Sequence, residues 1–161
     1  MHRLVKGTHA MLRQFRFLAA AVIALTLASS AKADTRVTQI IAHRGSSADR
    51  PECTLVSIQR AIAAGATAVE VDVRTTKDGH LVILHDATLD RTTNGSGKLQ
   101  DKTLVEVRQL DAGSWFDPKY RAQRVPTLKE VLVLCKGKID VLLDLKQQGD
   151  EYNTAVVAEV K

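Results

Sequence analysis

The sequence predicts an α/β fold with a largely parallel β-sheet, because apolar runs typical of strands alternate with segments whose apolar residues recur at helical spacing. The chain has 161 residues, whereas a complete (β/α)₈ barrel takes roughly 250. Only about four strands can be recognised along the chain. If the sheet belongs to such a barrel, the chain is therefore expected to be truncated to about its first four strands.

The elements are predicted in the order in which they occur along the chain. A β-rich run over 37–42 ends at His43, and apolar residues at helical spacing predict a helix over 54–64 that Gly65 ends. Strict alternation over 68–74 predicts a strand with valines on one face and acidic residues on the other. The other predicted elements are a strand over 81–84, a polar loop over 88–102, a helix from Thr127 to about Cys135, a strand over 139–145 and a helix that starts near Asn153.

The dipeptide Asp78-Gly79 is a signal for a two-residue hairpin turn, which would make the strands on either side of it antiparallel. In that register Thr76 lies opposite Leu81, and Asp72 lies opposite His85. If the two strands are instead parallel neighbours, Asp72 and His85 lie at adjacent strand ends. Both arrangements bring these two side chains close to each other.

Residues 1–33 have the features of a secretory signal peptide. Two arginines precede an apolar run over 17–28, and Ala31-Lys32-Ala33 matches the pattern of small residues at a cleavage site. The apolar run is shorter than the roughly 20 residues that span a bilayer. We therefore expect export to the periplasm or out of the cell, no stable membrane anchor after cleavage, and a mature domain over 34–161.

The net charge of +5 comes entirely from this leader. Residues 1–33 hold five of the 23 basic residues and no acidic residue, so 18 basic and 18 acidic residues remain over 34–161. A neutral domain in a chain that is only 4% aromatic argues against nucleic acid and membrane surfaces as partners. An oxidising compartment would permit a bond between Cys53 and Cys135, but two buried free thiols are equally compatible with the sequence.

Glu70 and Asp72 are the most informative pair of residues. At positions i and i+2 of a strand, their side chains point to the same side, with Cα atoms about 6.6 Å apart. Two inward-facing carboxylates repel each other and are costly to desolvate, and a divalent cation between them would relieve both costs. Oxygen ligands favour Mg²⁺ or Ca²⁺ over zinc. The alternative is a solvated polar face of an edge strand.

Other residues near strand ends could complete a site. His43 and His85 each follow an apolar strand, and functional groups gather at the carboxyl ends of parallel strands, so both histidines suit general acid and base work. Arg44 offers a forked donor for phosphate. Asp144 and Lys146 share one face of the last predicted strand. They could supply a third metal ligand and a cation for an anionic substrate, or form only a surface ion pair.

Seven short motifs occur in one order along the chain: Ile41-Ala42-His43-Arg44-Gly45, Pro51-Glu52-Cys53-Thr54, Glu70-Val71-Asp72-Val73, Thr76-Lys77-Asp78-Gly79, His85-Asp86, Leu89-Asp90-Arg91-Thr92-Thr93 and Val125-Pro126-Thr127-Leu128. Together they resemble the glycerophosphodiester phosphodiesterase family. The resemblance covers about residues 40–161, which correspond to the N-terminal half of the family's barrel domain.

This resemblance implies a phospholipase C-like TIM barrel that cleaves a small-molecule glycerophosphodiester to glycerol 3-phosphate and an alcohol, using a divalent ion. A glycerol hydroxyl of the substrate would attack phosphorus, and water would then open the cyclic phosphate. The roles that the resemblance implies are general acid and base for His43 and His85, metal ligands for Glu70, Asp72 and Asp144, and phosphate contacts for Arg44 and Lys146.

Two residues depart from the family's pattern, since Cys53 stands where Asn is usual and Asp144 stands where Glu is usual. Two alternative functions are also open. The missing strands suggest a non-catalytic truncated or degenerate fragment. The second alternative function is that of a related phospholipase D-like phosphodiesterase acting on sphingomyelin. The long loop over 89–104 and the lack of an obvious apolar membrane-inserting loop argue against this alternative.

Overall fold

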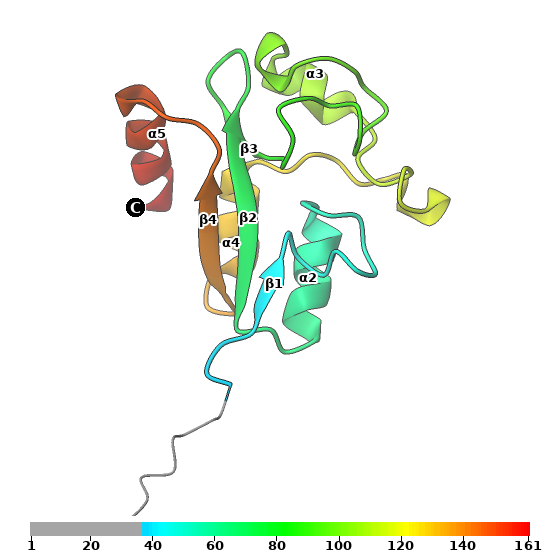
Figure 1. The fold of residues 1–161 in the computed structure, drawn as a ribbon, viewed down its shortest axis with the longest axis vertical. Coiled ribbons are helices and arrows are strands. Elements are labelled where there is room, and N and C mark those ends of the chain that lie inside the picture. The colour runs from blue at the N-terminus through cyan, green and yellow to red at the C-terminus, as the bar shows by residue number, and fades with distance from the viewer. Residues whose placement is uncertain (1–36) are drawn as a thin grey trace, which may run out of the picture. The chain divides into compact units, whose positions relative to one another are not determined.

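The computed structural model of the protein describes residues 37–161, and the predicted signal peptide over 1–33 lies outside the described residues. Figure 1 shows the path of the chain through a four-stranded sheet and its helices. Within 37–161, no helix has the combination of length and apolar character that crossing a membrane requires.

The elements are, in chain order, strand β1 (Ile41–His43), helix α2 (Leu55–Ala63), strands β2 (Ala68–Thr75) and β3 (Leu81–Ile83), the 3₁₀ helix η1 (Leu99–Asp101), helix α3 (Leu104–Gln109), the 3₁₀ helix η2 (Pro118–Tyr120), helix α4 (Leu128–Cys135), strand β4 (Asp140–Leu145) and helix α5 (Asp150–Val160).

Strand β2 lies at the centre of the sheet. β4 pairs with it in parallel along one edge, with Asp144 opposite Asp72. The carbonyl groups of Glu70 and Asp72 point to the other edge. Arg44, just after β1, donates its amide to the first of them and Leu84, just after β3, donates to the second, so β1 and β3 follow one another along this edge. Because β1 is parallel and only β3 is antiparallel to β2, the predicted α/β fold with a largely parallel sheet is confirmed.

The hairpin between β2 and β3 is antiparallel, as Asp78-Gly79 predicts, but its register differs by one residue from the expected one. Thr75, rather than Thr76, lies opposite Leu81. The turn is longer than two residues because the amide of Thr76 donates to the carbonyl of His80, which encloses a three-residue loop. The glycine of the loop has a φ of +81°, the left-handed conformation that commonly ends such loops.

The predicted pairing of Asp72 with His85 is therefore wrong. Leu84 lies beside Asp72 instead and donates its amide to the carbonyl of Asp72 at 3.0 Å. A shift of one residue exchanges the two faces of a strand, so the difference matters for where each side chain points. His85 lies beyond the end of β3, in the loop that follows it.

Helices α2 and α4 occupy the predicted segments. Each begins with a capping box, in which a threonine side chain accepts from the third amide of the helix and a side chain at that position reaches back to the threonine. Gly65 and Gly137 follow the two helices with positive φ angles of 81° and 70°. The first strand is shorter than predicted, since β1 starts at Ile41, and α5 starts at Asp150, before the expected position near Asn153.

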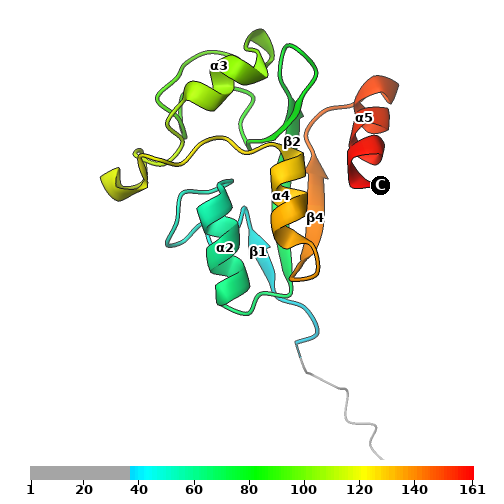
Figure 2. The same cartoon turned by 180° about the vertical axis from the view of Figure 1, so that it is seen from behind.

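The two faces of the sheet differ in what covers them. Val69, Val71 and Val73 of β2 have no exposed surface and belong to the larger core cluster, to which α2 and α4 also contribute. Figure 2 shows these two helices over that face, whereas in Figure 1 no helix of the described chain covers the opposite face. Cys53 and Cys135 are both buried and unpaired.

A second core cluster holds the long segment between β3 and α4. Its buried residues are Val82, Leu84, Leu89, Leu99, Val107, Ala112 and Val125. The segment over 88–102, predicted as a polar loop, therefore contributes two leucines to a core and contains the 3₁₀ helix η1.

Candidate active site

Three carboxylates meet on the face of the sheet that is left uncovered by the helices of the described chain. Glu70 and Asp72 come from β2, and Asp144 comes from the neighbouring position of β4. One carboxylate oxygen from each lies within 4.8 Å of the other two. Glu70 is 7% and Asp72 only 1% exposed. This part of β2 is therefore a buried acidic centre on a central strand and not the solvated face of an edge strand.

The charge of this centre is only partly compensated by the protein. Burial raises the pKa of Glu70, and the nearby Asp72 adds to that increase, while a hydrogen bond from the Arg44 amide opposes it. Asp72 Oδ1 is buried and accepts no hydrogen bond. The Lys146 Nζ forms an ion pair with it at 2.9 Å, and the same Nζ lies 2.5 Å from Asp144 Oδ2.

This donor set fits a hard divalent cation. All three residues offer oxygen, the buried Asp72 Oδ1 has only the Lys146 ammonium beside it, and Asp144 keeps the centre open to solvent because its side chain is 47% exposed. Asp144 reaches the cluster although its side chain is shorter than that of glutamate. Lys146 could then turn toward the oxygens of an anionic substrate.

The turn after β1 places two predicted residues beside the acidic centre. His43 lies opposite Glu70 in the sheet, and its Nε2 is 3.9 Å from Glu70 Oε2. The amide of Arg44 donates to the same oxygen at 3.0 Å. The Arg44 guanidinium lies over the centre, with Nε 3.6 Å from Asp72 Oδ2 and Nη1 donating to Glu52 at 3.1 Å.

Helix α2 holds this turn in place. Gly45 has a φ of +80°, and a side chain there would collide with Ser57 in the first turn of α2. Ser57 Oγ donates to the carbonyl of Arg44 at 3.1 Å, and the amide of Ser46 donates to the carbonyl of Ser57 at 2.9 Å. The positions of His43 and Arg44 therefore depend on the position of the helix.

His85 is held from two directions. Arg74 of β2 donates through Nε and Nη2 to the carbonyl of His85, at 2.9 and 2.7 Å. On the other side, the ring Nδ1 of His85 lies 2.7 Å from Asp86 Oδ1. The hydrogen bonds of Arg91 to Asp86 hold the pKa of that carboxyl far below its ordinary value.

The structure places around the site several residues whose roles the sequence pattern did not indicate. Asp86, Arg91 and Glu52 lie in the motifs that carry the family resemblance. Arg91 contacts Asp86 five positions away, but its contact with Glu52 joins segments 39 positions apart. A carboxylate immediately after a strand-end histidine was the available signal for Asp86. Arg74 gave no signal, because alternation alone places it on a polar face.

Cys53, which stands in place of the usual Asn, also reaches the centre. Its thiol donates to Asp72 Oδ2 across 3.4 Å, and the residue itself adopts a φ of +56°. Burial, followed by the nearby Asp72 charge, raises the pKa of this thiol well above its ordinary value. Cys53 is therefore a neutral donor to a metal-ligand candidate.

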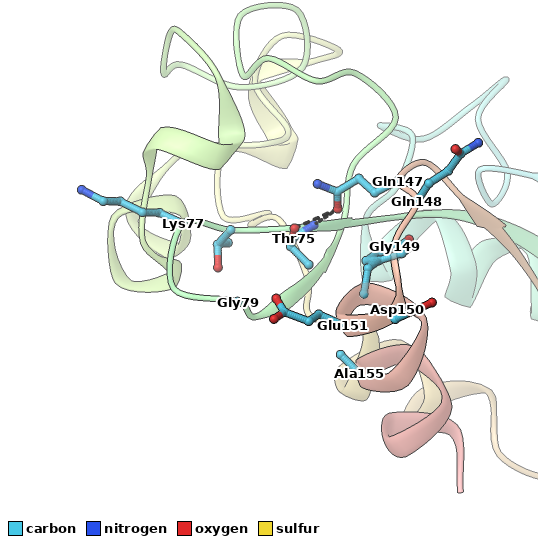
Figure 3. Close-up of a pocket in the computed structure, with 11 residues that line it drawn as sticks. Thr75, Lys77, Gly79, Gln147, Gln148, Gly149, Asp150, Glu151 and Ala155 are labelled. Atoms are coloured by element: carbon cyan, nitrogen blue, oxygen red, sulfur yellow. Dashed lines mark hydrogen bonds between the residues drawn. The ribbon is translucent and has the colours of Figure 1, made fainter.

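Two cavities lie near the carboxyl ends of β2 and β4. One of about 550 Å³, shown in Figure 3, is lined by the end of the hairpin and the start of α5 and includes none of the predicted site residues. The other, of about 390 Å³, includes Lys146 together with Arg74 and Lys98. The second cavity adjoins the acidic centre through Lys146.

The arrangement combines what phosphoryl chemistry requires. Two imidazoles can move protons, the guanidinium and the ammonium can neutralise phosphoryl oxygens, and the carboxylates can hold a cation. The structure brings Glu70, Asp72 and Asp144 together with Arg44 and Lys146, and places His43 beside Glu70. His85 is connected to this group through Asp86, Arg91 and Glu52.

Comparisons with known proteins agree on one family. The sequence matches the Glycerophosphoryl diester phosphodiesterase family over residues 43–158. A glycerophosphodiester phosphodiesterase of Caldanaerobacter subterraneus is 50% identical over 109 residues, which are 68% of this chain and 44% of the relative.

Solved structures agree with this match. The crystal structure of a glycerophosphodiester phosphodiesterase from Agrobacterium tumefaciens has a TM-score of 0.72 and 38% identity, covering 77% of this chain and 54% of that one. An Oleispira antarctica phosphodiesterase in complex with the product sn-glycerol-3-phosphate has a TM-score of 0.73 and 40% identity, covering 76% and 51% of the two chains. The chain thus spans about half the length of the relatives it matches. The likeness confirms the predicted fold, part of a phospholipase C-like TIM barrel.

Proposed function

We propose that this chain, which belongs to the glycerophosphoryl diester phosphodiesterase family, carries a site that hydrolyses glycerophosphodiesters to glycerol 3-phosphate and an alcohol. The observation that carries the proposal is the convergence of three carboxylates with Arg44 and Lys146 on one face of the sheet. The Oleispira relative, whose structure contains sn-glycerol-3-phosphate, supports the identity of the product.

The protein's own residues would bind the phosphoryl group and transfer the protons of the reaction. Arg44 and Lys146 bind the phosphoryl oxygens and offset the charge that develops on them. One imidazole, His43 or His85, accepts the proton of a substrate glycerol hydroxyl as its oxygen bonds to phosphorus. The other imidazole gives a proton to the alcohol oxygen as the bond from that oxygen to phosphorus breaks.

The cyclic phosphate that results is opened by the reverse sequence of proton transfers. Water loses a proton to the imidazole that had served as the acid, and the glycerol oxygen regains a proton from the other. Phosphate thereby stays on one glycerol hydroxyl, and glycerol 3-phosphate is released. The two histidines thus regain their starting protonation states after each turnover.

We propose that Glu70, Asp72 and Asp144 hold Mg²⁺ or Ca²⁺, since all three ligands are hard oxygens. When bound, the cation would act as a Lewis acid on a phosphoryl oxygen. Asp144→Asn should weaken binding of the cation, as measured by isothermal titration calorimetry with each ion. Asp140→Asn is the matched control, because Asp140 is an exposed aspartate of the same strand outside the cluster.

The decisive experiment measures glycerol 3-phosphate release from glycerophosphocholine with and without EDTA. We expect release in the presence of the cation and its loss on chelation. Activity indifferent to EDTA would contradict the metal role, and sphingomyelin cleavage in place of glycerophosphocholine cleavage would point to the phospholipase D-like alternative.

One observation favours a second candidate, a binding module without turnover. The face of the sheet that carries the acidic centre is not covered by a helix of the described chain, and Leu142 on that face is 51% exposed. An uncovered face can bind a ligand while admitting too much water for efficient catalysis. Calorimetric binding of glycerol 3-phosphate without any turnover would favour this candidate over the enzyme.

We also propose that the protein is exported, to the periplasm or out of the cell. The proposal rests on the leader sequence over 1–33, with its apolar run and its small-residue cleavage pattern. The mature protein should begin after Ala33, which mass spectrometry of the protein recovered from cell fractions would determine. A protein retained inside the cell with its leader intact would contradict export.

A further inference from the structure

We propose that Arg91 is a positioning residue that holds His85 and Arg44 in place through a single guanidinium, the Arg91 bridge. This inference deepens the proposed function and rests on it for its catalytic meaning. Arg91 lies in the segment after β3, while the two groups that it steadies belong to different loops. The bridge consists of Arg91 with the carboxylates of Asp86 and Glu52.

The guanidinium of Arg91 is shared between two carboxylates. Toward Asp86, its Nε lies 2.7 Å from Oδ2 and its Nη2 lies 3.0 Å from Oδ1. Toward Glu52, its Nη1 lies 3.0 Å from Oε2 and its Nη2 lies 2.7 Å from Oε1. Only a planar fork can make two such bidentate contacts at once, so lysine cannot replace the arginine without loss.

Asp86 transmits the position of Arg91 to the His85 ring. The contact between Asp86 Oδ1 and the ring Nδ1 measures 2.7 Å. Arg91 keeps the pKa of Asp86 far below its ordinary value, so this carboxyl is ionised and can only accept a hydrogen bond. The ring must therefore carry its proton on Nδ1, which leaves the lone pair of the neutral ring on Nε2.

Glu52 transmits the position of Arg91 in the opposite direction. Its Oε1 accepts from both Arg91 and Arg44, at 2.7 and 3.1 Å, and its side chain is only 13% exposed. Arg44 in turn lies 3.6 Å from the buried Asp72. One chain of contacts therefore links a proton-transfer residue to a phosphate-binding residue and to a metal-ligand candidate.

A purely stabilising ion pair is the competing explanation, and the molecule contains a matched control for it. Arg108 makes the same kind of bidentate contact with Glu130, at 2.9 and 2.7 Å. Its side chain is 36% exposed, compared with 43% for Arg91. The Arg108 pair lies outside the proposed site, so Arg108→Gln removes a similar contact without disturbing His85.

The first measurement needs no activity. Long-range proton–nitrogen correlation spectra of the full chain in EDTA report which ring nitrogen of His85 is protonated, and the His85 signals are identified by their loss in His85→Gln. We expect the Nδ1-protonated form in the unsubstituted protein and in Arg108→Gln, and a mixture of both tautomers in Arg91→Gln. A His85 spectrum unchanged by Arg91→Gln would overturn the inference.

Asp86→Asn provides a second route if Arg91→Gln does not fold by circular dichroism. An amide can donate as well as accept, so this change removes the preference for a proton on Nδ1 while leaving Arg91 paired with Glu52. A mixture of tautomers supports the inference. A single Nδ1-protonated form in Asp86→Asn would contradict it.

The second measurement is turnover of glycerophosphocholine. Because misplacement by about 1 Å can cost about 10²-fold, we expect kcat of Arg91→Gln to fall by about that factor. KM should rise as well, because Arg44 is loosened, and Arg91→Lys should show an intermediate loss. Unchanged kcat and KM in Arg91→Gln would overturn the positioning role.

The two measurements separate the failure of this inference from the failure of the proposed function. If the unsubstituted chain lacks turnover but Arg91→Gln still alters the His85 tautomer, the proposed function fails and the positioning of the ring stands. If the unsubstituted chain turns over and neither measurement responds to Arg91→Gln, the inference fails and the proposed function stands.

Discussion

Strand β2 presents valines to one side and carboxylates to the other, and the comparison of these two faces separates stability from function. Val69, Val71 and Val73 have no exposed surface and pack beneath α2 and α4. Glu70 and Asp72 alternate with them, are almost as deeply buried, and lie on the face that no helix of residues 37–161 covers in Figure 1. The valine face adds favourable burial of apolar area, whereas on the acidic face burial, followed by the nearby Asp72 charge, raises the pKa of Glu70.

The difference teaches that burial alone does not identify a core. A buried carboxylate without a full set of donors lowers stability until a ligand or cation compensates it. Asp72 has such an oxygen, which forms no hydrogen bond and faces only the Lys146 ammonium, whereas the neighbouring valines have no polar side-chain atoms. The two faces should therefore respond oppositely to substitution and to added cation.

The largest expected effect is on catalysis. His43→Ala or His85→Ala should lower turnover of glycerophosphocholine by at least roughly 10²-fold, the usual scale for acid and base residues. Thermal unfolding of His43→Ala should change little, because that side chain is 68% exposed. His80→Ala, in the hairpin turn, is the control and should keep its rate. A rate near normal in either site variant would exclude that histidine from proton transfer.

The next largest expected effect is on stability in the presence of a cation, and it involves the acidic face alone. Adding Ca²⁺ or Mg²⁺ at 100 times its dissociation constant should raise the free energy of unfolding by about 2.7 kcal/mol, since the cation binds only the folded state. Denaturant titration with and without EDTA measures this difference. Asp144→Asn should reduce it and Asp140→Asn should not; an equal response in both variants would place the cation elsewhere.

A substitution on the opposite face should cost stability and leave cation binding unchanged. Val71→Ala removes buried apolar groups worth about 0.8 kcal/mol each and leaves a cavity, so we expect a loss of about 2 kcal/mol in the free energy of unfolding. Val133→Ala is the control, because Val133 is 68% exposed, and it should change stability by less than about 0.5 kcal/mol. Equal losses in the two variants would contradict the division between the faces.

The smallest expected effect is on the loss of stability at acidic pH. The pKa of Asp86 is lowered in the folded state, chiefly by Arg91, so the ionised carboxyl stabilises the fold above its unfolded pKa of about 3.9. That contribution is lost as the pH falls below this value toward the lower folded pKa. Urea unfolding between neutral and acidic pH should therefore show a flatter decline in Arg91→Gln, and parallel profiles would argue against the contact.

Local patterns predicted most of the fold because their causes are local. The capping box at Thr127, the helical spacing of apolar residues over 54–64 and the alternation over 68–74 depend on residues only a few positions apart. The capping box at Thr54 was not recognised in the sequence. Helix α3 escaped prediction although Thr103 and Glu106 form the same capping box. It is short and lies next to a segment that composition marks as a loop.

The register of the hairpin and the Arg91 bridge could not be predicted in the same way. Asp78-Gly79 is compatible with more than one loop length. The hydrogen bond from the Thr76 amide to the His80 carbonyl fixes a loop of three residues. The contact between Arg91 and Glu52 spans 39 positions, so no local pattern contains it. The acidic cluster was more accessible to prediction, because two of its members share one strand.

Because Gly45 lies so close to Ser57, substitutions at these two positions should depend on each other during evolution. Any side chain at 45 would strike the start of α2, and any larger side chain at 57 would press against the turn that carries His43 and Arg44. Neither position can change freely while the other stays as it is. In a set of orthologous sequences we therefore expect 45 to be glycine and 57 to be small, and a rare exchange at one to be accompanied by a compensating exchange at the other.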